Sequence, residues 1–363
     1  MKAIERIAPD VGWLPISFVN TYLIGHHGGP WALVDTGLPG RARQIIEAAE
    51  ARFGGGTRPE AIYLTHGHFD HAGSVLQLAA HWDVPIFAHR MELAYLTGRS
   101  DYPPPDPTIG GAMAFLSRFM PHRGRDLTNW VRELPENALP GLPEWRWIST
   151  PGHSPGHVSY FRASDRVLLA GDAFATMNMD SWSGLVSARK KISRGDAPFN
   201  FDWAMTRQSV RKLAELKPKV AACGHGIPMD NEELSQQLDA YAAGFRPPRR
   251  GRYIARAAEV TESGVAWLPP APFDPVPLAT AGALLIAGIA LGAGYVEEQL
   301  GDEQVESVQR TCLTILVSHR RADRRREARW RSVAAGWHLR PQTFLWSYGS
   351  HRTRCNSLSG RTH

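Results

Sequence analysis

One short segment, residues 65–71 with the sequence THGHFDH, concentrates side chains that bind divalent metal ions. Imidazole nitrogen and carboxylate oxygen are zinc ligands, and this segment offers both. His66 and His68 are separated by one residue, so in an extended loop their side chains project to the same side. Asp70 and His71 follow after the chain turns and can reach a second point nearby. One loop can therefore supply ligands to two metal ions.

Three further side chains of the same type follow segments that we expect to be strands. His153 lies in a Gly- and Pro-rich turn, Asp172 comes after the apolar run 167–170, and His225 comes after the apolar run 220–223. Sites in α/β proteins lie where strands end, so these side chains are expected to meet segment 65–71. A single loop histidine is usually just solvated, but four separate strand ends that each present His or Asp are hard to explain by packing.

The elements that must position these residues alternate between strands and helices along the chain. Short apolar or alternating runs bounded by Gly and Pro predict strands, and longer amphipathic runs predict helices. The expected strands are 18–24, 31–34, 61–64, 85–88, 145–148, 158–161, 167–170 and 220–223. The expected helices are 41–53, 203–216 and 231–241. This alternation predicts an α/β fold.

Residues 99–145 interrupt the alternation. Four prolines between positions 103 and 107 predict a stiff loop, and a helix is expected over 111–120. Long loops in α/β enzymes are usually functional, so we expect an insertion that covers the site. A surface loop without contact to substrate is the alternative.

The order H-x-H-x-D-H, followed by a distant His, Asp and His, resembles the metallo-β-lactamase superfamily over about residues 5–235. The resemblance implies an α/β fold of four layers, an αββα sandwich. It implies that a first zinc is held by His66, His68 and His153, that a second is held by Asp70, His71 and His225, and that Asp172 bridges the two. In the segment TPGHSPGH it makes His153 the ligand and His157 a structural residue. Asp35 matches an aspartate that orients a ligand histidine, although a turn or a helix cap would also explain it.

The chemistry expected of such a centre is hydrolysis. Two cations that share a water lower its pKa toward neutrality, so a metal-bridging hydroxide can attack a carbonyl of a small-molecule substrate. Asp172 would hold both ions and Asp70 would also orient the nucleophile, which makes these two carboxylates the expected catalytic residues. No Ser or Cys nucleophile is needed.

Differences between this sequence and individual branches of the superfamily limit the classes of substrate. β-Lactamases of this fold lack the bridging aspartate, so Asp172 argues against them, and His68 argues against flavodiiron proteins, which carry Glu there. Glyoxalase II enzymes (hydroxyacylglutathione hydrolases) share all seven ligands, which implies cleavage of a thioester or ester. Their glutathione-binding cations have a possible match in residues 189–191, Arg-Lys-Lys, which could equally be a solvated loop.

Two alternatives within the same superfamily stay open. Lactone hydrolases share the metal set, but they use a tyrosine soon after the bridging aspartate, and none occurs here between Asp172 and Tyr241. Sulfur dioxygenases bind a single iron through two His and one Asp, which would be His66, His153 and Asp172.

The charge distribution argues against a nucleic-acid partner. The pI is about 9.4, but residues 301–363 alone contain 12 Arg, no Lys and five acidic residues. The remaining chain holds 29 basic and 30 acidic residues and has no basic run that would follow a phosphate backbone. Of the three cysteines, only Cys223 precedes residue 300, and residues 1–13 contain no apolar run like that of a signal peptide. We therefore expect a cytoplasmic catalytic domain.

The C-terminal third divides by composition. We expect a catalytic domain over 1–244, a Pro- and Arg-rich linker over 245–274, a membrane-spanning helix over 275–296 and a disordered basic tail over 297–363. Residues 275–296 carry no charge and, at 1.5 Å per residue, would span about 33 Å as a helix. Such a helix would anchor the catalytic domain to the inner face of a membrane; a buried helix is the alternative. Nothing in the sequence indicates the oligomeric state.

Overall fold

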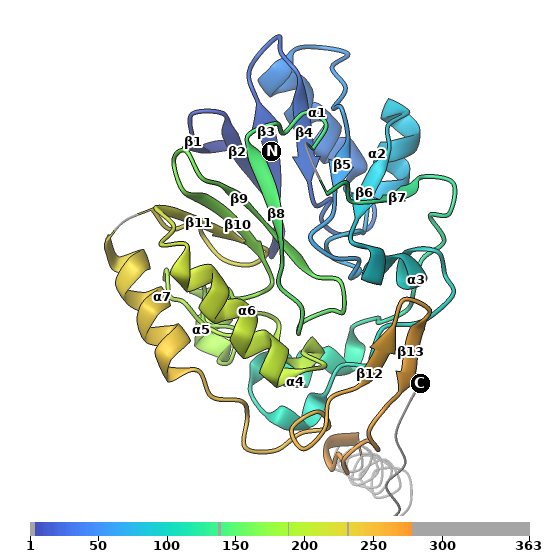
Figure 1. Ribbon diagram of the computed structural model, residues 1–363, viewed down its shortest axis with the longest axis vertical. Coiled ribbons are helices and arrows are strands. Elements are labelled where there is room, and N and C mark those ends of the chain that lie inside the picture. The colour runs from blue at the N-terminus through green and yellow to red at the C-terminus, as the bar shows by residue number, and fades with distance from the viewer. Residues whose placement is uncertain (1–3, 137–138, 188, 231, 278–363) are drawn as a thin grey trace, which may run out of the picture. The chain divides into compact units, whose positions relative to one another are not determined.

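Two β-sheets packed face to face carry the segments identified above (Figure 1). The structure, a computed structural model, describes residues 4–136, 139–187, 189–230 and 232–277. The first sheet has the strand order β1 (Glu5–Ala8), β2 (Val11–Ile16), β3 (Val19–Gly25), β4 (Trp31–Val34), β5 (Ile62–Tyr63), β6 (Ile86–Ala88) and β7 (Val131–Glu133). Strands β1 to β4 pair antiparallel and β4 to β7 pair parallel. The second sheet has the order β11 (Val220–Cys223), β10 (Val167–Gly171), β9 (Val158–Arg162) and β8 (Trp145–Ser149).

Helices cover the outer face of each sheet, which gives four layers. Helices α1 (Ala42–Phe53) and α2 (Val75–Trp82) pack on the first sheet, and α6 (Trp203–Glu215) and α7 (Glu232–Gly244) pack on the second (Figure 1). The alternation along β3 shows why both faces are apolar: Leu23 packs toward α1 and α2, whereas Tyr22 and Ile24 enter the core between the sheets. The predicted α/β sandwich is therefore confirmed.

The insertion between β6 and β8 contains short helical turns and one strand. After η1 (Arg90–Glu92) and α3 (Leu93–Leu96) come η2 (Pro107–Ile109), α4 (Ala112–Leu116) and η3 (Ser117–Phe119). The helix predicted over 111–120 is thus one α-helical turn continued by a 3₁₀ turn. The sequence analysis did not predict β7, whose three residues are too few to show a period.

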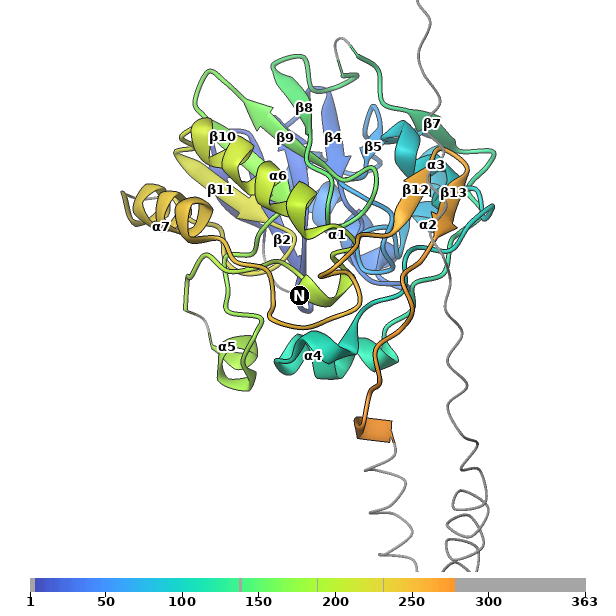
Figure 2. The same ribbon diagram turned by 60° about the horizontal axis from the view of Figure 1, so that its bottom comes forward.

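Residues 245–274 are not a linker, in contrast to the expectation. Phe245 and Tyr253 are buried in the core of α6 and α7, and a hairpin of β12 (Glu259–Thr261) and β13 (Gly264–Trp267) follows (Figure 2). The Tyr253 hydroxyl donates to the carbonyl of Pro104, and the amide of Val265 donates to the Ser100 hydroxyl. The compact unit therefore extends to Asp274. Its many Pro and Arg residues hid the few buried side chains that hold this segment.

The proposed membrane helix, 275–296, and the proposed disordered tail, 297–363, lie outside the described residues apart from 275–277. Within the part of the chain that the structure describes, none of the helices is both long and apolar enough to cross a membrane.

Candidate metal centre

All seven predicted ligands converge at one end of the sandwich, and every one of them is buried. The loop that follows β5 supplies four of them, the turn between β8 and β9 supplies His153, and the ends of β10 and β11 supply Asp172 and His225. Their potential ligand atoms fall into groups whose members lie within 4.8 Å of one another: His66, His68 and His153; Asp70, His71 and His225; and His66, His71 and Asp172. The first two groups correspond to the two metal positions expected from the sequence.

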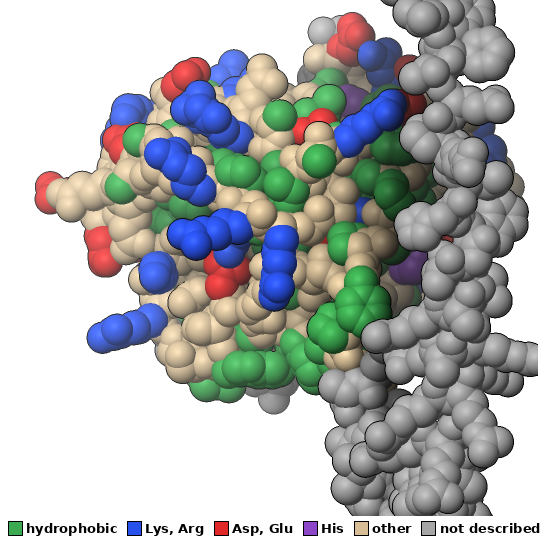
Figure 3. All heavy atoms as spheres, turned by 90° about the horizontal axis from the view of Figure 1, so that it is seen from below, with side chains coloured by type: hydrophobic (Ala, Val, Ile, Leu, Met, Phe, Trp, Pro, Cys, Tyr) green, Lys and Arg blue, Asp and Glu red, His purple; other side chains and the backbone are tan. Residues whose placement is uncertain are grey.

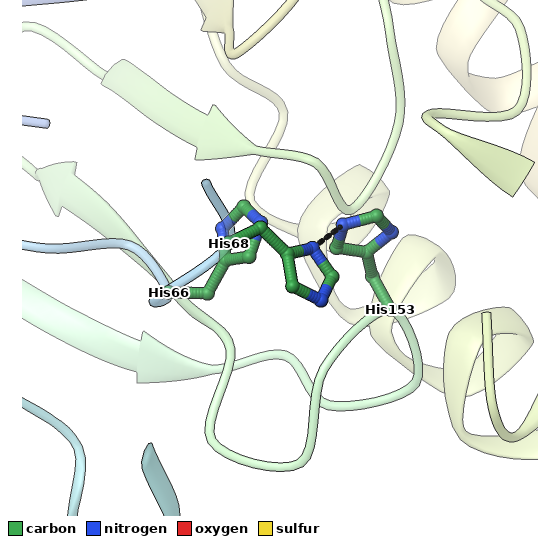
Figure 4. Close-up of side chains that lie close together, drawn as sticks. All are labelled: His66, His68 and His153. Atoms are coloured by element: carbon green, nitrogen blue, oxygen red, sulfur yellow. Dashed lines mark hydrogen bonds between the residues drawn. The ribbon is translucent and has the colours of Figure 1, made fainter. Parts of the chain in front are cut away.

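The first group meets across two loops. The Nδ1 atom of His68 lies 2.9 Å from Nε2 of His153 (Figure 4). The ring of His66 stands edge-on to both other rings, with its centre 4.5 Å from that of His68 and 4.8 Å from that of His153. Burial and the neighbouring histidines lower the pKa of both His66 and His68 well below the usual value. Three neutral imidazoles at this spacing are a typical binding site for a divalent metal.

Asp172 lies between the two groups. Its Oδ1 atom is 3.5 Å from Nε2 of His71, and its Oδ2 atom is 3.2 Å from Nε2 of His225 and 3.6 Å from Nε2 of His153. Burial alone would raise the pKa of Asp172, but His225 and His71 outweigh burial and hold that pKa well below the usual value. A carboxylate with one oxygen toward each side is suited to bridge two ions.

Hydrogen bonds outside the centre turn the Nε2 atom of several histidines inward. Nδ1 of His225 lies 2.8 Å from the carbonyl oxygen of Phe18, and Nδ1 of His71 lies 2.8 Å from Asp35 Oδ2. Because these oxygens only accept, Nδ1 carries a proton, and Nε2 is the nitrogen that can bind a metal. Nδ1 of His153 likewise faces Asn200 Oδ1 at 3.3 Å. The predicted role of Asp35 beside a histidine of the centre agrees with this contact.

Four buried atoms at the centre have no hydrogen-bond partner: Nε2 of His66, His71 and His225, and Oδ1 of Asp172. Leaving a buried polar atom unpaired costs about 1–3 kcal/mol, so a cluster of four needs a ligand. The space is also narrow, since a Cβ on Gly224 would lie 2.0 Å from Asp172 Oδ1. Soft imidazole donors together with carboxylates fit divalent ions such as zinc, and the donor set therefore suits a dinuclear metal site.

Glu92, which the sequence analysis did not single out, joins the two loops that carry the first group. One carboxylate oxygen accepts hydrogen bonds from the amide of Gly67 at 3.0 Å and from the Tyr102 hydroxyl at 2.5 Å. The other accepts from the Ser154 hydroxyl at 2.6 Å and from the amide of Gly156 at 2.8 Å. Burial raises the pKa of Glu92, and the four donors offset part of that rise. Only its position in the fold reveals this role, because its neighbours in sequence form no motif.

Gly67 leaves room for the side chains of Tyr102 and Leu96. A Cβ at this position would lie 2.2 Å from the Tyr102 hydroxyl and 2.6 Å from Cδ2 of Leu96. The Tyr102 ring packs against His68 with ring centres 4.6 Å apart. The insertion predicted to cover the site therefore does contact the 65–71 loop.

His157 is structural, as expected. Its Nε2 atom accepts a hydrogen bond from the amide of Asp172 at 2.9 Å, so Nδ1 carries the proton and donates to the Thr150 hydroxyl. The Thr150 hydroxyl is also hydrogen-bonded to the Ser159 hydroxyl, which donates to the carbonyl of Ala170. Burial lowers the pKa of His157 to about 3, and the neutral ring fixes the backbone at Asp172.

The segment before α6 forms another wall of the centre. The Phe199 ring lies 4.9 Å from that of His68, and Gly195 packs against the carbonyl of Asp172. Between them Asp196 is buried, its Oδ1 atom has no hydrogen-bond partner, and burial raises its pKa well above the usual value. Cys223 is buried, and burial raises the pKa of its thiol.

Comparison with known proteins agrees with this geometry. A family model described as the metallo-beta-lactamase superfamily matches residues 14–225. Probable metallo-hydrolase YflN of Bacillus subtilis is 40% identical over 239 residues, which cover 65% of this chain and 90% of that protein. A hydroxyacylglutathione hydrolase of Acidiphilium cryptum is 30% identical over 247 residues, which cover 68% of this chain and 77% of that enzyme.

Solved structures of similar proteins include a metallo-beta-lactamase family protein from Thermus thermophilus, at 24% identity and a TM-score of 0.43 over 66% of this chain and 80% of that chain. Another is TTHA1623, solved in a di-iron-bound form, at 24% identity and a TM-score of 0.42 over 65% of this chain and 97% of that chain.

Proposed function

Because this chain belongs to the metallo-β-lactamase superfamily of metallohydrolases, we propose that it is a dinuclear zinc hydrolase that cleaves a thioester or ester of a small molecule. The observation that carries the proposal is Asp172, placed with one oxygen toward His71 and the other toward His153 and His225. Two bound zinc ions would supply the Lewis acidity that ionises a water molecule and polarises the acyl carbonyl.

The residues of the chain then have separate tasks. Asp70 Oδ2 lies 3.5 Å from His225 Nε2 and can hold the proton of the attacking water and so orient it. Asp35, Asn200 and the Phe18 carbonyl keep three imidazoles in the tautomer that leaves Nε2 free. Phe199 and Tyr102 pack on His68 and exclude water from that side.

A thioester with an anionic portion is supported by a cavity beside His225. Its volume is about 280 Å³, and its lining includes Phe18, Met177, Gly226 and Arg189. Phe18 also stacks on the His225 ring with centres 6.1 Å apart, so the cavity adjoins the second metal group. Apolar walls with one guanidinium suit an extended group that ends in a carboxylate. The distant hydroxyacylglutathione hydrolase relatives are named for substrates of this chemistry.

The experiment is a substrate panel for the zinc-loaded protein: S-lactoylglutathione, a simple lactone, nitrocefin and a phosphodiester. We expect the thioester to have the highest kcat/KM, and Asp172→Ala to abolish its hydrolysis. Hydrolysis of the phosphodiester alone would defeat the proposal. A single bound iron together with oxygen uptake on a sulfur substrate would instead identify a sulfur dioxygenase, and preferred cleavage of the lactone would identify a lactone hydrolase.

A further inference from the structure

Four exposed apolar side chains gather where α4, η3 and α5 (Trp182–Val186) meet. Phe119 is 76% exposed, Trp182 is 57% exposed and Val186 is 87% exposed. The Phe115 ring lies 6.4 Å from Phe119 and 5.8 Å from Trp182, so residues of two separate segments form one patch. We call Phe115, Phe119, Trp182 and Val186 the aromatic face. A contiguous apolar patch of this kind on a protein surface usually marks a binding site.

The layer beneath the aromatic face is rich in methionine. Met113 and Met179 are buried there, and Met120 and Met177 pack partly buried against them. Methionine side chains are flexible and polarisable, so they adapt to contacts of varying shape. In Figure 3, which views the molecule from below, hydrophobic side chains gather along one edge of this side, with Lys and Arg side chains nearby.

Three consecutive cations follow α5 almost directly. Arg189, Lys190 and Lys191 are exposed and line a groove of about 910 Å³ together with residues of α7 that include Glu233. Lys190 lies 4.0 Å from Asp230, so part of its charge is compensated. Glu233 and Asp230 together offset only two of the three positive charges, so the groove keeps a net positive charge beside the aromatic face.

The described chain also ends at this face. Asp274 accepts hydrogen bonds from the Arg118 guanidinium at 2.7 and 2.8 Å, and Arg118 belongs to the same turn as Phe119. Phe273, immediately before it, is 75% exposed. In the sequence, the 22 residues that follow Asp274 carry no charge. The chain therefore leaves the compact unit beside the aromatic face and continues with these 22 uncharged residues.

We propose that the aromatic face and the groove of Arg189, Lys190 and Lys191 together bind the surface of an anionic lipid bilayer. Phenylalanine and tryptophan rings suit the boundary between headgroups and acyl chains, and adjacent cations suit lipid phosphates. The cations favour lipid over a second copy of this chain, because a two-fold contact through the same face would bring like charges together.

The test is co-sedimentation of the full-length, zinc-loaded protein with vesicles of phosphatidylcholine, either alone or mixed equally with phosphatidylglycerol. Phe119→Ser/Trp182→Ser should lower the partition coefficient on mixed vesicles about tenfold or more, because two large apolar groups no longer leave water. Lys190→Glu/Lys191→Glu should weaken binding to mixed vesicles and make it less sensitive to salt, while binding to pure phosphatidylcholine stays unchanged.

Two matched variants serve as controls. Leu76→Ser removes an exposed leucine from α2, and Arg41→Glu/Arg43→Glu reverses two exposed charges near the start of α1, both on the outer layer of the other sheet. Both should partition within about twofold of the unchanged protein. The arginines of 301–363 are present in every variant, so differences in vesicle binding between variants come from the aromatic face and the adjacent groove.

Three results would overturn the proposal. The unchanged protein does not sediment with the vesicles, or the control variants lose as much vesicle binding as the variants of the face. The third is that Phe119→Ser/Trp182→Ser has a lower molar mass in solution than the unchanged protein when no lipid is present. The last would identify a contact between copies. Hydrolysis of a soluble thioester is measured in parallel, so that failure of the hydrolase assignment is seen separately.

Discussion

Asp35 Oδ2 lies 2.8 Å from Nδ1 of His71, and this contact joins the end of β4 to the loop that follows β5. The same carboxylate accepts hydrogen bonds from the amide and the hydroxyl of Thr65, both at 2.8 Å. Asp35 holds a left-handed backbone conformation with a φ of 58°, which a residue other than glycine adopts at a cost. The fold therefore accepts local strain to place one carboxylate behind a histidine of the metal centre.

This relationship predicts that Asp35→Asn weakens metal binding without removing a ligand. An amide can accept the His71 proton but cannot also serve both Thr65 donors as an ionised carboxylate does, so metal affinity should fall about 10–100-fold. Zinc affinity is measured by competition with a chromophoric chelator. Asp83→Asn is the matched control, because Asp83 also has a positive φ but lies at the end of α2. Equal affinity in Asp35→Asn and the unchanged protein would contradict the assigned role.

A second prediction concerns Glu92, which fastens the 65–71 loop to the 152–157 turn. In Glu92→Gln one side-chain oxygen becomes an NH₂ group that faces two donors, so we expect a loss of about 2–4 kcal/mol in the free energy of unfolding. The first metal should be lost more readily than the second, because both loops of the first group are affected. Tyr102→Phe removes a single donor to Glu92 and should cost about 1 kcal/mol. Urea unfolding and cobalt absorption spectra measure the two effects.

Binding of the two metals should release different numbers of protons. In the metal-free protein Asp172 and Asp70 raise the pKa of His225 to about 9, despite burial, whereas burial lowers that of His153 to about 4. At pH 7 the Asp70, His71 and His225 group therefore holds protons that a metal must displace, and the His66, His68 and His153 group does not. Affinity at the second group should rise with pH up to about 9 and stay flat at the first.

Calorimetric zinc titration in buffers of different ionisation enthalpy at pH 7 measures these protons. About two should leave with the second equivalent and almost none with the first. Stability of the metal-free protein should change in the opposite direction. The pKa of His225 is raised above its ordinary 6.5, so its ionic contribution is complete below that pH and is lost as pH rises through about 9. Equal proton release in both steps would contradict the asymmetry.

Arg189 provides a test of substrate specificity. If it receives an anionic end of the substrate, Arg189→Ala should raise KM for S-lactoylglutathione about tenfold or more and leave kcat nearly unchanged. A neutral thioester such as S-acetyl-N-acetylcysteamine should be affected less than twofold. Arg207→Ala, an exposed arginine on α6, is the matched control. A similar loss for both thioesters would mean that Arg189 acts on structure rather than on substrate charge.

The sequence was most informative where chemistry depends on side-chain type. The seven candidate ligands could be predicted because His and Asp at the ends of four strands serve no packing purpose, and the apolar runs of β3, β9 and β10 are typical of strands. Glu92 could not be found this way, because its partners, Gly67 and Ser154, are 25 and 62 positions away and meet only in the fold.

The same reasoning explains the error at 245–274. Pro and Arg dominate its composition, but stability depends on single buried residues such as Phe245 and Tyr253. Periodicity cannot reveal isolated anchors of this kind, because each is a single buried residue in a segment without a repeating apolar pattern.

The measurement that tests the central claim most directly is a zinc titration of the metal-depleted protein, with thioester hydrolysis as the readout. Because Asp172 faces both groups, full activity should require two equivalents of zinc. The variant Asp172→Ala should show no hydrolysis, however much zinc is added. Activity that is complete at one equivalent, or that appears only with iron, would contradict a dinuclear zinc hydrolase.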